Sequence, residues 1–178
     1  LMLLKDLLPN QELTKKSLPS TNSLDKNLNL EITAIVTDSR VVTKGSIFFA
    51  LQGKTVNGVE FIDDAITKGA VAIVRLKIQG GSVKEEYNVV IIESTNPHDL
   101  LVLCLDKFYP NLPTNLFAIT GTNGKTSTAE FVRQMLEMVG KKAASIGTLG
   151  VISNDKEIYK EIDNSALTTP DIVSLYKN

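Results

Sequence analysis

The chain has 178 residues, of which 43% are hydrophobic and 22% are charged, and its formal net charge is -1. This composition is ordinary for a soluble globular protein, and it excludes a fibrous repeat and a largely disordered chain. A near-neutral charge gives no general attraction for nucleic acid, and the apolar runs are too short for a membrane span, so we expect neither partner.

The first half of the sequence is typical of a small α/β domain. Two β-branched and aromatic runs, at residues 32–37 and 46–51, predict strands joined by a loop. A turn at Asn57 and Gly58 then leads to apolar positions at helical spacing from Phe61, which predict a short helix. Gly69 stands where the end of that helix needs a left-handed residue.

Two further strands and a clearly marked helix complete this half. Residues 70–74 and 88–93 predict strands, separated by a polar stretch that contains two glycines. Asn96 is a favourable N-cap, and Pro97 suits the first turn of a helix. The pattern predicts a helix that continues to about Tyr109.

Pro110 and Pro113 mark the expected domain boundary. Proline interrupts a helix, and the segment that contains both prolines has no apolar periodicity. We therefore expect an N-terminal domain at residues 1–112 and the start of a second domain at residues 113–178.

The second half begins with a strand, a glycine-containing turn and a helix. Residues 116–120 predict a short buried strand, and residues 126–140 predict an amphipathic helix that ends at Gly140. The residues expected to face inward from this helix are Phe131, Met135, Met138 and Val139. Residues 143–153 predict another strand, residues 154–157 a hairpin turn that leads to residues 158–162, and Thr169 the N-cap of a last helix.

The turn "TGTNGKTS" at residues 120–127 has the composition of a phosphate-binding loop. Its glycines let the backbone approach an anion, and the following helix N-terminus adds partial positive charge. In such a loop Lys125 meets the outer phosphates and Thr126 holds Mg²⁺. The alternative is a plain turn with an exposed lysine, but the order of strand, loop and helix favours phosphate binding. Because Ile119 replaces a glycine of the standard pattern, the loop is not an ordinary Walker A sequence.

Several motifs together resemble the Mur ligase family. The loop at residues 120–127 is similar to the ATP-binding loop of this family, which also includes folylpolyglutamate synthetases. Residues 37–74 resemble the UDP-binding domain of the MurE and MurF ligases, which folylpolyglutamate synthetases lack. The sequences "GTLG" at 147–150 and "LTTPD" at 167–171 resemble the MurE type.

The resemblance implies a fold and a function. The fold is α/β, with a small N-terminal UDP-binding domain followed by the start of a P-loop, Rossmann-like ATP-binding central domain. The function is that of an ATP- and Mg²⁺-dependent amide ligase of peptidoglycan precursor synthesis. It adds meso-diaminopimelate or L-lysine to UDP-N-acetylmuramoyl-L-alanyl-D-glutamate through an acyl phosphate. A MurF-type ligase, a P-loop kinase or switch NTPase, and a non-catalytic nucleotide-binding module remain alternatives.

The resemblance also assigns roles to residues. Lys125 and Thr126 are the expected catalytic residues, with Thr126 as the metal ligand. The residues expected to bind ATP are Gly121, Thr122, Asn123, Gly124, Lys125, Thr126 and Ser127. The residues expected to bind the UDP substrate are Thr37, Ser39, Lys54, Thr55, Val56, Thr168 and Thr169. For the stretch "DSR" at 38–40 the alternative is a surface turn in which Arg40 is paired.

Other features bear on completeness and location. The single cysteine, Cys104, cannot form an internal disulfide and fits a reducing compartment, so we expect a cytoplasmic protein. We also expect a monomer. The sequence starts with Leu1 and stops within an apparent helix, so we expect a fragment that lacks ligase activity by itself. The carbamylated lysine, further metal ligands and the C-terminal domain of the family are expected after Asn178.

Overall fold

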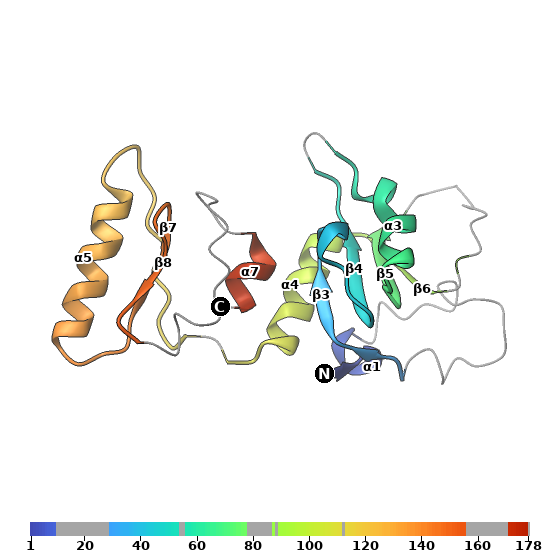
Figure 1. Ribbon diagram of the computed structural model, residues 1–178, viewed down its shortest axis with the longest axis horizontal. Coiled ribbons are helices and arrows are strands. Elements are labelled where there is room, and N and C mark those ends of the chain that lie inside the picture. Colours follow the sequence, from blue (N-terminus) through green and yellow to red (C-terminus); the bar gives the residue numbers. More distant parts are fainter. Residues whose placement is uncertain are drawn as a thin grey trace. The chain divides into compact units, whose positions relative to one another are not determined.

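The structure is a computed structural model that describes residues 1–9, 29–53, 56–77, 87, 89–111, 113–155 and 171–177. The chain forms two compact units, Leu1–Pro110 and Asn111–Asn178 (Figure 1). No helix in the described ranges is long and apolar enough to cross a membrane. The "DSR" stretch lies in the first unit and the glycine loop in the second.

A parallel sheet of four strands forms the centre of the first unit. Its strands lie side by side in chain order, and they are β3 (Ala34–Val36), β4 (Ser46–Ala50), β5 (Ala72–Leu76) and β6 (Val90–Ser94). All residues of β4 are buried, as expected for a parallel sheet that is covered on both faces. The α/β class predicted from the sequence is confirmed.

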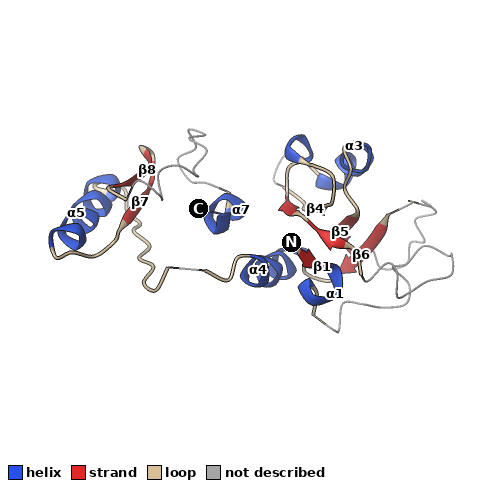
Figure 2. Ribbon diagram, turned by 60° about the horizontal axis from the view of Figure 1, so that its bottom comes forward, coloured by secondary structure: helices blue, strands red, loops and turns tan. Residues whose placement is uncertain are grey.

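Helices cover both faces of this sheet. Helix α3 (Ile62–Thr67) lies on one face, and α4 (Pro97–Phe108) and α1 (Leu4–Leu7) lie on the other (Figure 2). Phe48 and Ile73 join a buried cluster with residues of α3. Since side chains alternate along a strand, the neighbouring Phe49 and Val74, both fully buried, point to the opposite face.

The first residues of the chain are attached to α4. Leu4 and Leu7 are fully buried. The ammonium group of Lys107 donates to the carbonyl oxygens of Asp6, at 2.9 Å, and Leu8, at 3.3 Å. These contacts make the start of the chain part of the core, although it is remote from the rest of the unit in sequence.

Helix α4 confirms the predicted start signal, because the Asn96 side chain accepts a hydrogen bond from the Asp99 amide at 3.3 Å. The expected strand at 32–37 is instead two short strands. Strand β2 (Glu31–Ile32) pairs antiparallel with β1 (Met2–Leu3), whereas β3 joins the parallel sheet. Between them the Thr33 hydroxyl donates to the carbonyl oxygen of Lys44 at 2.9 Å. This tie at Thr33 divides the predicted strand.

Gly58 begins the 3-10 turn η2 (Gly58–Phe61), which packs against the end of β4. A Cβ atom at this position would lie 2.5 Å from the carbonyl oxygen of Leu51 and 2.8 Å from the carbonyl carbon of Ala50. Gly58→Ala is therefore expected to lower the free energy of unfolding of this unit by roughly 1–3 kcal/mol, because backbone atoms must move apart. Denaturant unfolding measures this change.

The control for this variant is Val59→Ala in the same turn, because the Val59 side chain is 38% exposed. A surface truncation of this kind is expected to change the free energy of unfolding by less than about 1 kcal/mol. Equal stability of Gly58→Ala and the unsubstituted chain would contradict the close contact.

In the second unit, α5 (Lys125–Met138) lies beside a hairpin of β7 (Ala144–Gly147) and β8 (Gly150–Ser153), and α7 (Ile172–Lys177) follows later in the chain. The predicted single strand at 143–153 is therefore wrong, since Thr148 and Leu149 form a turn and Gly150 has a φ of 80°. The predicted turn and strand at 154–162 lie mostly outside the described residues. Asp171 caps α7 by accepting from the Val173 amide at 3.0 Å, and the expected cap residue Thr169 lies outside the described residues.

The predicted strand at 116–120 is also wrong. Leu116 is 86% exposed and Phe117 is 67% exposed, and the described residues include no strand that pairs with this segment. A strand needs the backbone of a neighbour to satisfy its amides and carbonyls. The apolar composition was therefore insufficient evidence for a strand.

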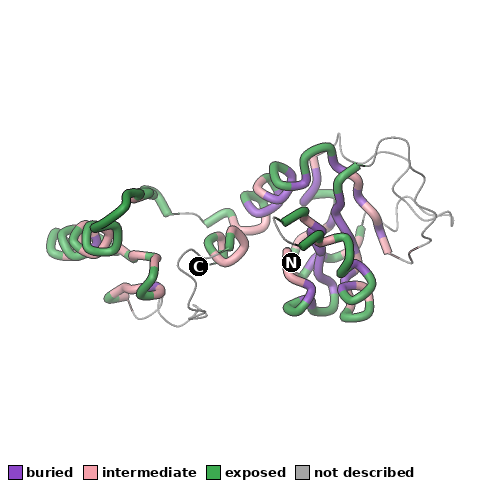
Figure 3. The backbone as a smooth tube through the Cα atoms, turned by 90° about the horizontal axis from the view of Figure 1, so that it is seen from above, coloured by how far each residue is buried: buried purple, intermediate pink, exposed green. Residues whose placement is uncertain are grey.

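The expected inward face of α5 is exposed. Phe131, Met135, Met138 and Val139 are 63%, 66%, 86% and 70% exposed. The side turned to the hairpin instead carries half-buried Val132 and Leu136 around the buried Arg133, and the remaining tube of α5 is largely exposed (Figure 3). The helix has apolar residues on two sides, and the hairpin does not cover the side that was predicted to face inward.

Candidate functional site

The glycine loop turns the chain directly into the first turn of α5. Gly124, the residue before the helix, has a left-handed φ of 77°, a conformation that favours glycine. The first bond of the helix runs from the Thr128 amide to the carbonyl oxygen of Gly124 at 2.9 Å. The amides of Lys125, Thr126 and Ser127 therefore have no acceptor within the helix, and Gly124 has no side chain to cap them. This helix end carries the partial positive charge that suits an anion.

The ammonium group of Lys125 lies over its own loop. It donates to the carbonyl oxygen of Gly121 at 2.5 Å and to that of Thr122 at 3.4 Å. Within the described ranges it forms no ion pair with a carboxylate. Phosphate oxygens are stronger partners for an ammonium group than neutral carbonyls are, so Lys125 can exchange these contacts for an anion.

The predicted ATP-binding residues lie together at this helix end and are exposed: Gly121, Thr122, Asn123, Gly124, Lys125, Thr126 and Ser127. The described part of the chain contains no group of three or more His, Cys, Asp or Glu side chains that could hold a metal ion. Thr126, the predicted Mg²⁺ ligand, lies exposed in the first turn of α5. Mg²⁺ keeps water and phosphate oxygens as ligands, so one hydroxyl fits an ion that arrives with a nucleotide.

A buried charge cluster joins α5 to the hairpin. Arg133 is 6% exposed and forms ion pairs with Glu130 and, at 2.6 Å, with Glu137. Glu130 accepts a hydrogen bond from the Ser145 hydroxyl at 3.3 Å, and Glu137 accepts one from the Asn154 amide at 3.2 Å. Sequence analysis missed this cluster. Its signal was the spacing of three and four residues between the arginine and the two glutamates.

The charges in this cluster shift each other's titration. Hydrogen bonding from Arg133, followed by that from Gln134, lowers the pKa of Glu130 to about 2. Hydrogen bonding from Glu130, followed by that from Glu137, raises the pKa of Arg133. Both shifts favour the charged forms, so the ion pair persists throughout the neutral range.

Acid is expected to loosen the hairpin from α5. The pKa of Glu130 is about 2 in the folded unit and 4.5 in a free side chain, so protonation favours the unfolded form. The stabilisation is complete above a pH of about 4.5 and is lost as the pH falls towards about 2. Amide chemical shifts of the hairpin, followed by NMR, should show a transition in this window. Glu130→Gln should lack that transition, and its persistence in this variant would assign it to another group.

In the first unit, two predicted substrate segments reach the same edge of the sheet. Thr37 follows the carboxyl end of β3, and the described residues 51–53 and 56–58 follow the carboxyl end of β4. Ligands of parallel sheets bind at this edge. Val56 is 49% exposed, and its carbonyl oxygen accepts from the Gly53 amide at 2.9 Å. Of the other predicted substrate residues, the following lie outside the described residues: Lys54, Thr55, Thr168 and Thr169.

The "DSR" stretch is already engaged in local contacts. Arg40 pairs with Asp38 at 2.6 Å on the surface, as the alternative interpretation expected, and hydrogen bonding from Arg40 lowers the pKa of Asp38. Ser39 is buried, and its carbonyl oxygen accepts from Lys68 at 3.1 Å. Hydrogen bonds from Lys68 and then from the Ser39 hydroxyl lower the pKa of Asp64. Ser39 therefore joins this stretch to α3.

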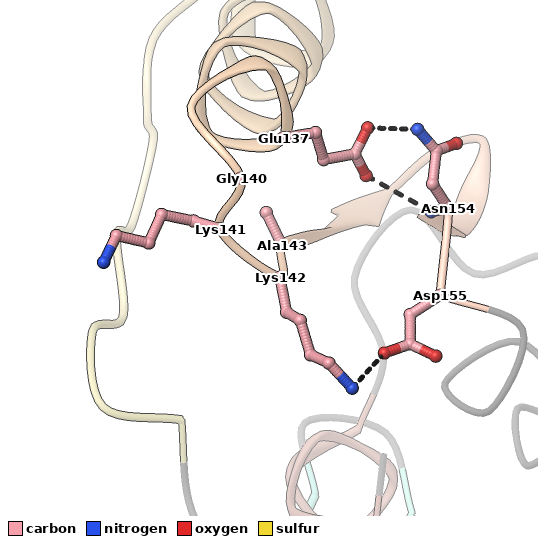
Figure 4. Close-up of a pocket in the computed structure, with 7 residues that line it drawn as sticks. All are labelled: Glu137, Gly140, Lys141, Lys142, Ala143, Asn154 and Asp155. Atoms are coloured by element: carbon pink, nitrogen blue, oxygen red, sulfur yellow. Dashed lines mark hydrogen bonds and ion pairs between the residues drawn. The ribbon is translucent and has the colours of Figure 1, made fainter.

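A shallow hollow of about 460 Å³ lies at the other end of α5, away from the glycine loop (Figure 4). Its lining residues are Glu137, Gly140, Lys141, Lys142, Ala143, Asn154 and Asp155. Lys142 pairs with Asp155 at 2.7 Å, and Glu137 accepts from Asn154. The hollow thus lies between the C-terminal end of α5 and the base of the hairpin.

Two family models match the chain. The model described as "Mur ligase family, catalytic domain" matches residues 31–106, and the one described as "Mur ligase middle domain" matches residues 119–178. The first model includes the sheet and the "DSR" stretch. The second includes the glycine loop, α5 and the hairpin.

The chain is also similar to curated proteins named UDP-N-acetylmuramoyl-L-alanyl-D-glutamate--2,6-diaminopimelate ligase. The protein from Bradyrhizobium diazoefficiens is 43% identical over 148 residues, which are 83% of this chain and 28% of that protein. The protein from Agrobacterium fabrum is 42% identical over 147 residues, again 83% of this chain and 28% of the relative. The chain thus spans less than a third of the length of these relatives.

The chain is also similar to one solved structure with the same ligase name. The aligned region includes 98% of this chain and 32% of the chain in that structure, with a TM-score of 0.61. Its sequence identity is 19%, so the likeness concerns the fold alone.

Proposed function

The chain belongs to the Mur ligase family, and we propose that it is part of an ATP-dependent amide ligase of peptidoglycan precursor synthesis. The proposed substrates are UDP-N-acetylmuramoyl-L-alanyl-D-glutamate and an amino acid. The names of its relatives support 2,6-diaminopimelate rather than lysine as that amino acid, and they do not support the MurF-type alternative. The observation that carries the proposal is the glycine loop: the first amides of α5 have no acceptor within the helix, and the Lys125 ammonium group, which contacts only neutral carbonyl oxygens among the described residues, suits a triphosphate.

We assign one substrate to each domain. Residues 1–112 would bind the UDP part of the nucleotide substrate at the carboxyl edge of the sheet, with Thr37, Ser39 and residues 54–56. Residues 113–178 would begin the ATP-binding domain, with Thr168 and Thr169 as further substrate contacts. The matched family models support this order, because the catalytic-domain model precedes the middle-domain model along the chain.

The proposed reaction has two steps. The free carboxylate of the dipeptide attacks the γ-phosphate of ATP, which forms an acyl phosphate and releases ADP. The amine of the incoming amino acid then attacks the acyl carbon, which forms the amide and releases phosphate. Such transfers depend on positioning and on stabilising the charge that develops on the transferred group.

The residues of the loop would supply that stabilisation. Lys125 would leave the carbonyl oxygens of Gly121 and Thr122 and neutralise the outer phosphates. The amides of Lys125, Thr126 and Ser127 would donate to phosphate oxygens at the positive end of α5. Thr126 would hold magnesium, which supplies charge neutralisation between the phosphates when it is bound.

The proposal includes the location, the oligomeric state and the partners of the protein. We propose a cytoplasmic, monomeric protein that inserts into no membrane and binds no nucleic acid. The substrates are small charged molecules, and a formal net charge of -1 gives no overall attraction for nucleic acid.

Calorimetry tests the proposal. The 178-residue chain is titrated separately with Mg-ATP and with UDP-N-acetylmuramoyl-L-alanyl-D-glutamate, and one binding site is expected for each. ATP binding without binding of the UDP substrate would favour a kinase or a simple nucleotide-binding module. The chain alone is expected to form no tripeptide product, and product formation in the presence of the amino acid would contradict that expectation.

A further inference from the structure

Two side-chain bridges hold the β7–β8 hairpin along α5. Near the helix C-terminus, Glu137 accepts hydrogen bonds from the Asn154 amide at 3.2 Å and the Asn154 side chain at 2.5 Å. Closer to the helix N-terminus, Glu130 accepts one from Ser145 at 3.3 Å. The hairpin therefore runs back along the helix, and its tip lies toward the end where the glycine loop begins α5 (Figure 1).

The tip of the hairpin reaches the level of the glycine loop. From Glu130 back to Lys125 the helix axis covers about 7.5 Å, at a rise of roughly 1.5 Å per residue. From Ser145 forward to Thr148 the strand covers about 10 Å, at roughly 3.3 Å per residue. Along the helix axis, the turn at Thr148 and Leu149 thus reaches the level of the last residues of the loop, and both residues are exposed.

Arg133 allows both bridges to exist together. Without it, Glu130 and Glu137 would be two half-buried carboxylates of like charge on one side of the helix. Arg133 pairs with both, and its own side chain is buried beneath the hairpin. The guanidinium group therefore fixes the carboxylates that in turn fix the hairpin.

We propose that the charge cluster of Glu130, Arg133 and Glu137, through its two bridges to the hairpin, positions the hairpin tip beside the glycine loop. Thr148 and the adjacent backbone amides then form a second side of the nucleotide site. Glu130 and Arg133 are positioning residues, and Thr148 is the contact residue. The identity of the ligand rests on the proposed function, whereas the position of the tip does not.

The position of the tip can be measured without any ligand. Spin labels are attached at Thr128→Cys, in the first turns of α5, and at Leu149→Cys, both exposed positions, while the native Cys104 is buried. The interspin distance is expected to have one narrow distribution. Adding Glu130→Ala should remove this narrow distribution, because the bridge to Ser145 is lost. Gln134→Ala is the matched control, since Gln134 also bonds to Glu130 but belongs to the helix, and it should leave the distribution narrow.

A narrow, unchanged distribution in Glu130→Ala would overturn the proposal. If circular dichroism shows that Glu130→Ala unfolds the unit, Ser145→Ala takes its place, because it removes one hydrogen bond and leaves Arg133 paired. Ser153→Ala is then the control, since Ser153 donates to the Ala143 carbonyl within the hairpin. A narrow distribution in Ser145→Ala equal to that in Ser153→Ala would equally overturn the proposal.

The contact with nucleotide is tested by hydrogen exchange. Mg-ATP is expected to slow exchange at the amides of residues 148–150 in the unsubstituted chain, and to slow it less in Ser145→Ala even when that variant binds ATP. Saturating ATP that leaves these amides unprotected would overturn the second side of the site. Absence of ATP binding by calorimetry would instead overturn the proposed function and the nucleotide contact, while the label distances would still decide the position of the tip.

Discussion

Lys125→Met is expected to weaken ATP binding by about 100-fold, because a charged hydrogen-bond donor to the phosphates is worth roughly 1.5–3 kcal/mol and methionine supplies none. The left-handed Gly124 and the uncapped amides of α5 remain in this variant, so the fold of the loop region should persist. Calorimetry with Mg-ATP measures the loss, and circular dichroism checks that the helix is retained.

The control for this substitution is Lys141→Met. Lys141 is an exposed lysine just beyond the other end of α5, so this variant makes the same change of charge away from the glycine loop. ATP affinity should be unchanged in it. Equal losses in the two variants would mean that net charge, rather than the loop, governs nucleotide binding.

Arg133→Met should detach the hairpin from α5. Without Arg133, Glu130 and Glu137 lose their common partner and stand as two like charges on one side of the helix, which destabilises the attachment of the hairpin. The second unit is small, so the loss should be visible as fast amide exchange throughout residues 144–153. Hydrogen exchange on the unsubstituted and variant chains measures it.

Arg40→Met provides the comparison for Arg133→Met. Arg40 also pairs with a carboxylate, but its side chain is 85% exposed, and a surface pair of this kind adds little to stability. The stability of the first unit should therefore change little. If both arginine variants lower the stability of their own units by the same amount, burial is not the reason that Arg133 matters.

Local signals in the sequence were sufficient to predict those parts of the structure that depend only on neighbouring residues. The Asn96 cap and Pro97 defined the start of α4, because both act through the backbone of the next few residues. The glycine loop was recognised for the same reason, since Gly124 adopts its left-handed conformation within the turn itself.

The sequence was insufficient to predict those parts of the structure that depend on contacts with residues distant in the chain. Thr33 divides a β-branched run because Lys44 and Gly45 bond to it from the next loop. The apolar spacing of α5 did not show which of its two apolar sides the hairpin would cover. The burial of Arg133 was not predicted, because it depends on a hairpin whose residues were predicted as a single strand.

The contact between the Lys125 ammonium group and the carbonyl oxygens of Gly121 and Thr122 has a thermodynamic consequence. An arriving triphosphate does not meet a freely hydrated cation, since the ammonium group must first leave its intramolecular partners. The enthalpy of nucleotide association is therefore a difference between two sets of contacts. A modest heat for so highly charged a ligand is what this competition produces.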